Sequence, residues 1–207
     1  MATLQEIQAA MTGFPRTLTW NNFPNAATSH SPPHQAMTSA SWATSGWSVH
    51  VVNNEYRVRG ARVTVTLNSG SSWATPTAKA SASLLRHEQG HYDITGLIAR
   101  DLIRKVLDLS FSVDVVAALR DSGNTPAEHR NYVTRQFQRD INRFGTEANT
   151  LLARLQTNPA THADGIYDQQ TNHGLNTTAQ QQWNNRIQRV MGANEHFELW
   201  LRMEGII

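Results

Sequence analysis

The stretch "LLRHEQGHYDIT" (residues 84–95) decides the fold expected for this chain. His87 and His91 are four residues apart, so on a helix they lie on one face, one turn apart. Both imidazoles can then reach a single metal ion. The apolar residues that continue the same stripe are Leu84, Ile94, Ile98 and Leu102. The stretch therefore predicts a long helix whose metal-binding face is turned toward the interior of the protein.

Glu88 stands beside the first histidine and completes the pattern His-Glu-x-x-His, which is typical of zinc hydrolases. In such sites the glutamate takes a proton from a zinc-bound water and does not bind the metal. The alternative is a pair of buried histidines satisfied by hydrogen bonds, which is costly beside a buried carboxylate without a metal or another partner. We therefore favour a metal site with Zn²⁺ as the cofactor.

A catalytic zinc needs a third protein ligand, and the residues alone leave its identity open. The metzincin continuation is excluded, because Ile94 and Leu97 stand where that class has Gly and His. His173 has Gly174 directly behind it, where the backbone can turn to aim an imidazole. The candidates are Glu128, Glu147 and Glu195 in later helical segments, and Asp164, Asp168, His162 and His173 in one late loop.

The chain changes character near residue 75, from strand patterns to helix patterns. Before it, "WSVHVV" (47–52) and "RVTVTL" (62–67) alternate in the manner of strands, and residues 37–45 are a weaker strand candidate. The second of these strands places Val63, Val65 and Leu67 on one face.

The second part of the chain is expected to consist mainly of helices. Thr75-Pro76 is expected to open a helix that reaches about residue 109. Thr125-Pro126-Ala127-Glu128 has the form of a capping box and is expected to open a helix that ends near residue 158. A loop over 160–176 and a helix over 177–192 follow. The sequence therefore predicts an α+β fold, a small and mainly antiparallel sheet followed by long helices. We expect one domain over 1–207, β-rich over 1–74 and helical over 75–207.

Composition excludes several classes of function. The chain of 207 residues contains no Cys, so disulfides and thiolate metal sites are excluded. A net charge of +2 is too weak and scattered to indicate a nucleic-acid partner. No apolar run is long enough to predict a membrane span. The first residues, "MATLQEIQAAM", lack the basic residues and apolar stretch of an export signal.

Four pieces of sequence, in order, resemble a bacterial family described as predicted secreted zinc-dependent proteases. They are "LTWNNF" (18–23), Ser72-Trp73 before the helix, His-Glu-Gln-Gly-His with an aromatic residue and Asp behind it (87–93), and "YDQQTNHG" (167–174). The resemblance covers roughly residues 17 to 190. It implies a zincin-like fold, His87, His91 and His173 as zinc ligands, and Glu88 as general base. It also implies a secreted or periplasmic protein, in contrast to the missing export signal.

Other residues near these motifs are expected to assist catalysis. Tyr167 arrives on the same loop as His173 and is the candidate donor to the oxyanion, the alternative being a tyrosine that packs the loop down. Asp168 is expected to orient a ligand imidazole, ahead of Asp93, which faces elsewhere. The strand over 62–67 is either an edge that holds substrate as an added strand or a core strand, and we favour the core strand.

Together these features predict a zinc metallopeptidase that acts on a peptide or protein substrate. One alternative is a module of the same shape that binds zinc or a partner without hydrolysis, although the intact Glu88 argues against it. Another is a hydrolase of a non-peptide amide, which uses the same chemistry. The sequence does not indicate the oligomeric state.

Overall fold

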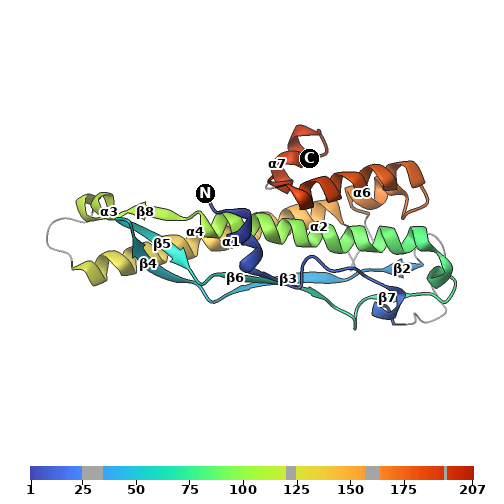
Figure 1. Ribbon diagram of the computed structural model, residues 1–207, viewed down its shortest axis with the longest axis horizontal. Coiled ribbons are helices and arrows are strands. Elements are labelled where there is room, and N and C mark those ends of the chain that lie inside the picture. The colour runs from blue at the N-terminus through green and yellow to red at the C-terminus, as the bar shows by residue number, and fades with distance from the viewer. Residues whose placement is uncertain (25–34, 120–124, 157–163, 194) are drawn as a thin grey trace.

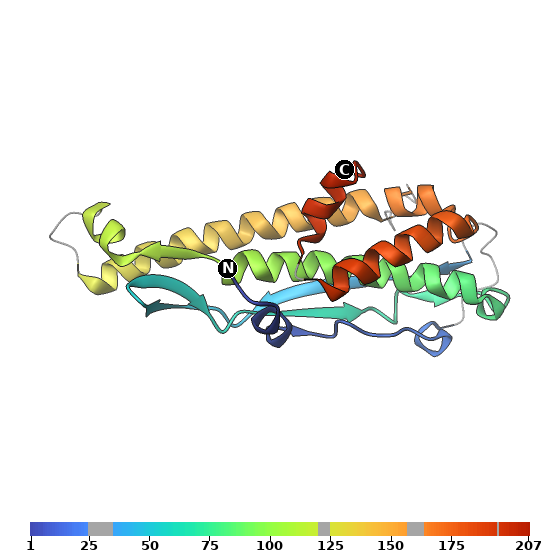
Figure 2. The same ribbon diagram turned by 45° about the horizontal axis from the view of Figure 1, so that its top comes forward.

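The computed structural model describes residues 1–24, 35–119, 125–156, 164–193 and 195–207. Its long axis is marked by two helices that run side by side, α2 (Ala82–Leu107) and α4 (Pro126–Leu155) (Figures 1 and 2). Strands cover one side of α2, and α6 (Thr177–Gly192) and α7 (Phe197–Met203) cover the opposite side (Figure 1). Every residue of α2 from Gly90 to Arg104 is buried, so α2 is the central element of the fold.

Within the described residues, the strand layer consists of three small sheets. In the largest pairing, β3 (Ala40–Ser45) runs antiparallel to β6 (Arg62–Leu67), with Trp42 opposite Val65. β1 (Met11–Thr12) lies parallel on the other side of β6. β6 thus has a neighbour on both sides and is the core strand that the sequence favoured, with Val63, Val65 and Leu67 buried. The other sheets are β2 (Ala36–Met37) with β7 (Trp73–Ala74), and β4 (Ser48–Val52) with β5 (Glu55–Arg59) and β8 (Ser110–Ser112).

The fold is mixed α+β, as predicted, but its strands are not confined to residues 1–74. β8 follows α2 in the chain and pairs antiparallel with β5, Tyr56 lying opposite Phe111. The reason is geometric: α2 carries the chain from one end of the molecule toward the other, where β5 offers an edge for a further strand (Figure 1). The remaining short elements are α1 (Leu4–Ala9), the 3-10 turns over Trp20–Asn22 and Ala78–Ala80, and α3 (Val113–Leu119).

The helix boundaries follow the capping residues. α4 begins with the predicted capping box, in which the backbone N–H of Glu128 donates to Thr125 Oγ1 and its carboxylate accepts from the backbone N–H of Thr125. The expected start of α2 at Thr75 is wrong, because Thr75 caps only the short 3-10 turn through a bond from the N–H of Ala78. α2 itself begins after Ser81, whose hydroxyl accepts from the N–H of Leu84. None of the described helices is both long and apolar enough to cross a bilayer.

Buried charges of α2 hold the two C-terminal helices. Arg100 is 3% exposed, and its guanidinium donates to the carbonyl oxygens of Val190 and Glu195, each at 2.9 Å, and to that of Met191 at 3.3 Å. Carbonyls at the end of a helix have no partner within that helix, so this arginine satisfies the end of α6. On α7, the N–H of Glu198 donates to Asp101 at 2.9 Å.

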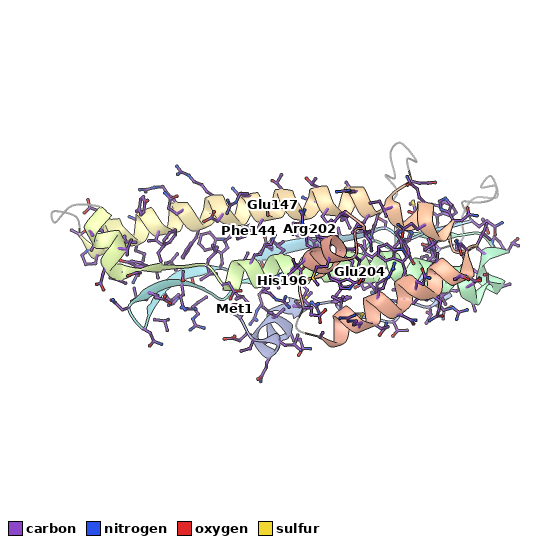
Figure 3. The ribbon with its side chains drawn as sticks, turned by 90° about the horizontal axis from the view of Figure 1, so that it is seen from above. Met1, Phe144, Glu147, His196, Arg202 and Glu204 are labelled. Atoms are coloured by element: carbon purple, nitrogen blue, oxygen red, sulfur yellow. The ribbon has the colours of Figure 1, made fainter. Side chains whose placement is uncertain are left out.

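The outer side of α7 is tied to the two long helices at the surface. Lys105 donates to Glu147 of α4 at 3.3 Å and to Glu198 of α7 at 3.1 Å. Figure 3 labels Phe144 and Glu147 on α4 and Arg202 on α7. Solvent-exposed pairs of this kind contribute little each, so Arg100 is the stronger anchor.

We predict that Arg100→Met destabilises the protein by roughly 2–4 kcal/mol, because it leaves several buried carbonyls without a donor. The matched control is Arg202→Met on the exposed side of α7, which is expected to cost less than about 1 kcal/mol. Urea denaturation followed by circular dichroism measures both. Equal effects of the two substitutions would contradict the anchoring role of Arg100.

Candidate metal centre

Two helices bring three ligand atoms together in the interior. α2 supplies His87 and His91, and the short helix α5 (Ile166–Thr171) supplies Asp168. The Nε2 atoms of the two histidines are 3.1 Å apart, and each lies 3.0 Å from Oδ1 of Asp168. Among the described residues, these three form a buried group that could hold a metal ion.

The hydrogen bonds of Gln180 fix which nitrogen of His87 carries a proton. The amide Nε2 of Gln180 donates to Tyr167 Oη at 2.7 Å and to Asn184 Oδ1 at 2.9 Å. Its Oε1 therefore faces His87 Nδ1 at 3.1 Å and can only accept. Thr171 lies on the same side at 3.3 Å, and because its hydroxyl donates to Tyr167 O it also accepts there. Nδ1 of His87 is thus the donor, so in the neutral ring Nε2 presents its lone pair to the group.

The electrostatics of the group favour an ionised aspartate. Burial by itself raises the pKa of Asp168, but His91 and His87 outweigh it, and the pKa ends well below its ordinary value. Burial by itself lowers the pKa of His91. The carboxylate of Asp168 raises it by more, and Glu88 raises it by a smaller amount, so the pKa of His91 ends above its ordinary value of 6.5. A carboxylate oxygen and two imidazole nitrogens at such short range require a positive charge between them, either a proton or a metal ion.

The spacing of the three atoms fits a single metal ion held between them. Zinc bonds of roughly 2.0–2.1 Å place tetrahedral ligand atoms roughly 3.3 Å apart, close to the 3.0–3.1 Å seen here. Because the Gln180 contact reserves Nε2 of His87 for coordination, His87 has the outer partner that ligand histidines usually have. The side chains of His87 and Asp168 are each 2% exposed and that of His91 is 11% exposed, so the group opens toward solvent on the His91 side.

α5 occupies part of the segment that was expected to be a loop. Three consecutive residues with left-handed backbone, Asn172, His173 and Gly174, end this helix. At Gly174 a Cβ atom would lie 2.9 Å from the Cβ of His87, so only glycine allows this turn to lie against α2. At the other end of α5, a Cβ on Gly165 would come within 2.4 Å of the backbone of Gln156, just behind α4. The two glycines thus let α5 lie closely enough for Asp168 to reach the histidines.

His173 lies at the edge of the group. Its Nδ1 is 3.7 Å from Oδ1 of Asp168, its Nε2 is 3.3 Å from Oδ2 of Asp164, and its ring centre is 6.3 Å from that of His87. The expectation that His173 is a ligand therefore stays a prediction. The third corner is occupied by Asp168, which the sequence offered both as a candidate ligand and as a residue that orients an imidazole. The residues that contact Nδ1 of His87, on the side away from the group, are Gln180 and Thr171. Sequence reasoning missed both, because nothing in a glutamine or a threonine on a later helix signals contact with His87.

Tyr167 lies behind His87 and its hydroxyl is engaged. Its ring stacks on the imidazole of His87 with centres 4.9 Å apart, and its hydroxyl donates to His87 O at 3.1 Å and accepts from Gln180. Burial raises the pKa of this fully buried tyrosine far above its ordinary value. This geometry favours the alternative role, a tyrosine that packs its segment against α2, over that of an oxyanion donor.

Glu88 points to the strand side of α2. It is 2% exposed, and Oε2 of its carboxylate accepts a hydrogen bond of 2.7 Å from Oγ1 of Thr38, a residue that the sequence did not single out. Asp93 faces elsewhere, as expected: it accepts from Gln89 at 2.9 Å, and burial raises its pKa to about 7 against the effect of that bond.

The other ligand candidates lie in different surroundings. Glu128 caps α4, Glu147 pairs with Lys105, and Glu195 lies 4.0 Å from Arg189. His162 lies outside the described residues. Comparison of the chain with protein-family models, with curated proteins and with solved structures finds no match. The geometry of the site therefore carries the functional argument.

We predict that Gly90→Ala disrupts the centre. A Cβ at this position would lie 2.0 Å from the hydroxyl of Tyr167, which is buried and cannot withdraw. The overpacking is expected to cost about 1–3 kcal/mol and to weaken metal binding. The matched control is Gly145→Ala in the middle of α4, where the new Cβ meets only Trp42 at 3.7 Å and a gain of up to about 1 kcal/mol is expected. Denaturation midpoints and metal content after dialysis measure both. A stabilised Gly90→Ala would show that Tyr167 does not pack there.

We also predict different effects of the two candidate third ligands. Asp168→Asn removes the charge from one corner of the group and is expected to lower metal affinity by more than about 100-fold, whereas His173→Ala, at the edge, is expected to lower it by about 10-fold or less. Competition with a chelator of known affinity measures both constants. The reverse order would identify His173 as the third ligand.

Proposed function

We propose that the protein is a zinc-dependent hydrolase that cleaves peptide bonds. The observation that carries the proposal is the buried triangle of His87, His91 and Asp168, with Glu88 adjacent on the same helix. The resemblance to a family of predicted secreted zinc-dependent proteases supports the same conclusion. A zincin-like arrangement of the site is part of this proposal.

The donor set supports zinc over calcium and magnesium. Calcium and magnesium take mainly oxygen ligands, whereas two imidazoles and one carboxylate are a donor set that zinc prefers. Three protein ligands are also the number that leaves a fourth position open for water or substrate. The partial exposure of His91 supports an opening on that side.

The chemistry divides between the cofactor and the chain. Zinc, when bound, supplies a Lewis acid that lowers the pKa of water toward neutral and polarises a carbonyl group. His87 and His91 would hold it as neutral imidazoles, and Asp168 would offset part of its charge. Glu88 accepts the proton of the attacking water through its carboxylate and passes it to the nitrogen of the leaving amine. Each turnover thus returns Glu88 to its ionised state.

The substrate class follows from this chemistry. A water activated in this way attacks the carbonyl carbon of an amide, so a peptide or protein is the proposed substrate. A non-peptide amide would undergo the same step. The strand side of α2, where Glu88 contacts Thr38, is the side from which the reacting carbonyl is proposed to approach.

We predict that Glu88→Gln retains zinc and stability but loses hydrolysis by at least about 10²–10⁴-fold, because the amide keeps the shape of the carboxylate but cannot accept the proton. Glu147→Gln, an exposed change on α4, is the control and is expected to behave as the wild type. Zinc content, melting temperature and the cleavage of casein and of a broad peptide library are measured for all three proteins.

Cleavage by Glu88→Gln at the wild-type rate would refute the mechanism. If the wild type holds zinc but cleaves nothing in the library, the protein is better described as a zinc-binding module.

A further inference from the structure

We propose that Thr38 is a positioning residue that fixes the carboxylate of Glu88, and that Ser72-Trp73 holds Thr38 in place. This inference rests on the proposed function and deepens it. Its basis is the bond of 2.7 Å from Thr38 Oγ1 to Glu88 Oε2, together with a second contact of 3.1 Å from the same hydroxyl to the backbone oxygen of Glu88.

A general base needs its carboxylate held in one orientation. The last torsion of a glutamate side chain has broad preferences, so the chain itself does not fix the two oxygens. A hydroxyl that donates to Oε2 fixes this torsion and leaves the other oxygen in a defined direction for the proton of water. The carboxylate of Glu88 is nearly fully buried, and the hydroxyl also satisfies it there.

The backbone on both sides of Thr38 is anchored. Before it, Met37 pairs with Trp73 in the β2–β7 ladder. After it, the N–H of Ser39 donates to Ser72 Oγ at 2.9 Å, and the carbonyl of Ser39 accepts from the N–H of Asn68 at 2.8 Å. Ser72 is 2% exposed, so this bond is protected from water. The hydroxyl of Thr38 is therefore preorganised by the strand layer before substrate arrives.

This arrangement explains why a Ser-Trp pair occurs shortly before the metal-binding helix. Ser72 and Trp73 contact the residues on either side of Thr38, and Thr38 contacts the base of the site. The strand layer thus forms a hydrogen bond with α2 at Glu88, while α5 and α6 form hydrogen bonds with it at His87.

The test compares Thr38→Val, which keeps the shape and removes the hydroxyl, with Thr38→Ser, which keeps the hydroxyl. Thr44→Val, at an exposed position of β3, is the matched control. We expect Thr38→Val to retain zinc and KM but to lose about 10–100-fold in kcat, the range seen when an outer hydrogen-bond partner is removed. Thr38→Ser is expected to restore kcat to within a few-fold, and Thr44→Val to match the wild type. An unchanged kcat in Thr38→Val, or a Thr38→Ser variant as impaired as Thr38→Val, would overturn the proposal.

A second measurement separates this proposal from the proposed function. Unfolding midpoints of Thr38→Val, Glu88→Ala and the double variant are compared in the zinc-free protein, where no hydrolysis is involved. If the effects are not additive, the two side chains interact and the inference stands even where the wild type cleaves no peptide. Additive effects would show that the two side chains do not interact, and would overturn the positioning role whatever the activity of the wild type.

Discussion

The convergence of two imidazole nitrogens on one carboxylate oxygen, all buried, is the constraint on which the rest of this structure depends. His87, His91 and Asp168 lie about 3.0 Å from each other in a place where an uncompensated charge would be costly. The fold must therefore supply three things: a helix rigid enough to align the histidines, a second element that reaches them with an aspartate, and partners for the outer nitrogens. α2 supplies the histidines, α5 the aspartate and α6 the outer partner Gln180.

Asp168 reaches the two histidines because the backbone of its segment lies close to α2 and α4. Gly90 admits the ring of Tyr167 against α2, Gly174 lies against His87, and Gly165 lets the chain pass close to the end of α4. A side chain at Gly90 or Gly174 would push α5 away from α2, and one at Gly165 would push it away from the end of α4. The small volume of these glycines therefore contributes to the convergence of the three side chains as directly as their charges do.

The site is shared between the two parts of the chain. The strand layer contacts Glu88 through Thr38, and the C-terminal helices contact His87 through Gln180 and Thr171. Glu88 and His87 are adjacent in sequence but face different layers, because successive residues of a helix point in directions about 100° apart. One turn of α2 therefore has a carboxylate held by the strand layer and an imidazole held by the C-terminal helices.

The sequence by itself determined the local features. The strand over 62–67, the capping box of α4, the helix over 177–192 and the pairing of His87 with His91 on one helix all follow from periodicity and capping, which act over a few residues. Only the tertiary structure decided which late residue meets the histidines. Asp168, Asp164 and His173 lie within ten residues of one another, and spacing cannot rank them because the bend of the chain sets which side chain points inward. The contacts of Thr38 and Gln180 are also tertiary, since they join residues 50 and 93 positions apart, a separation at which no local pattern in the sequence persists.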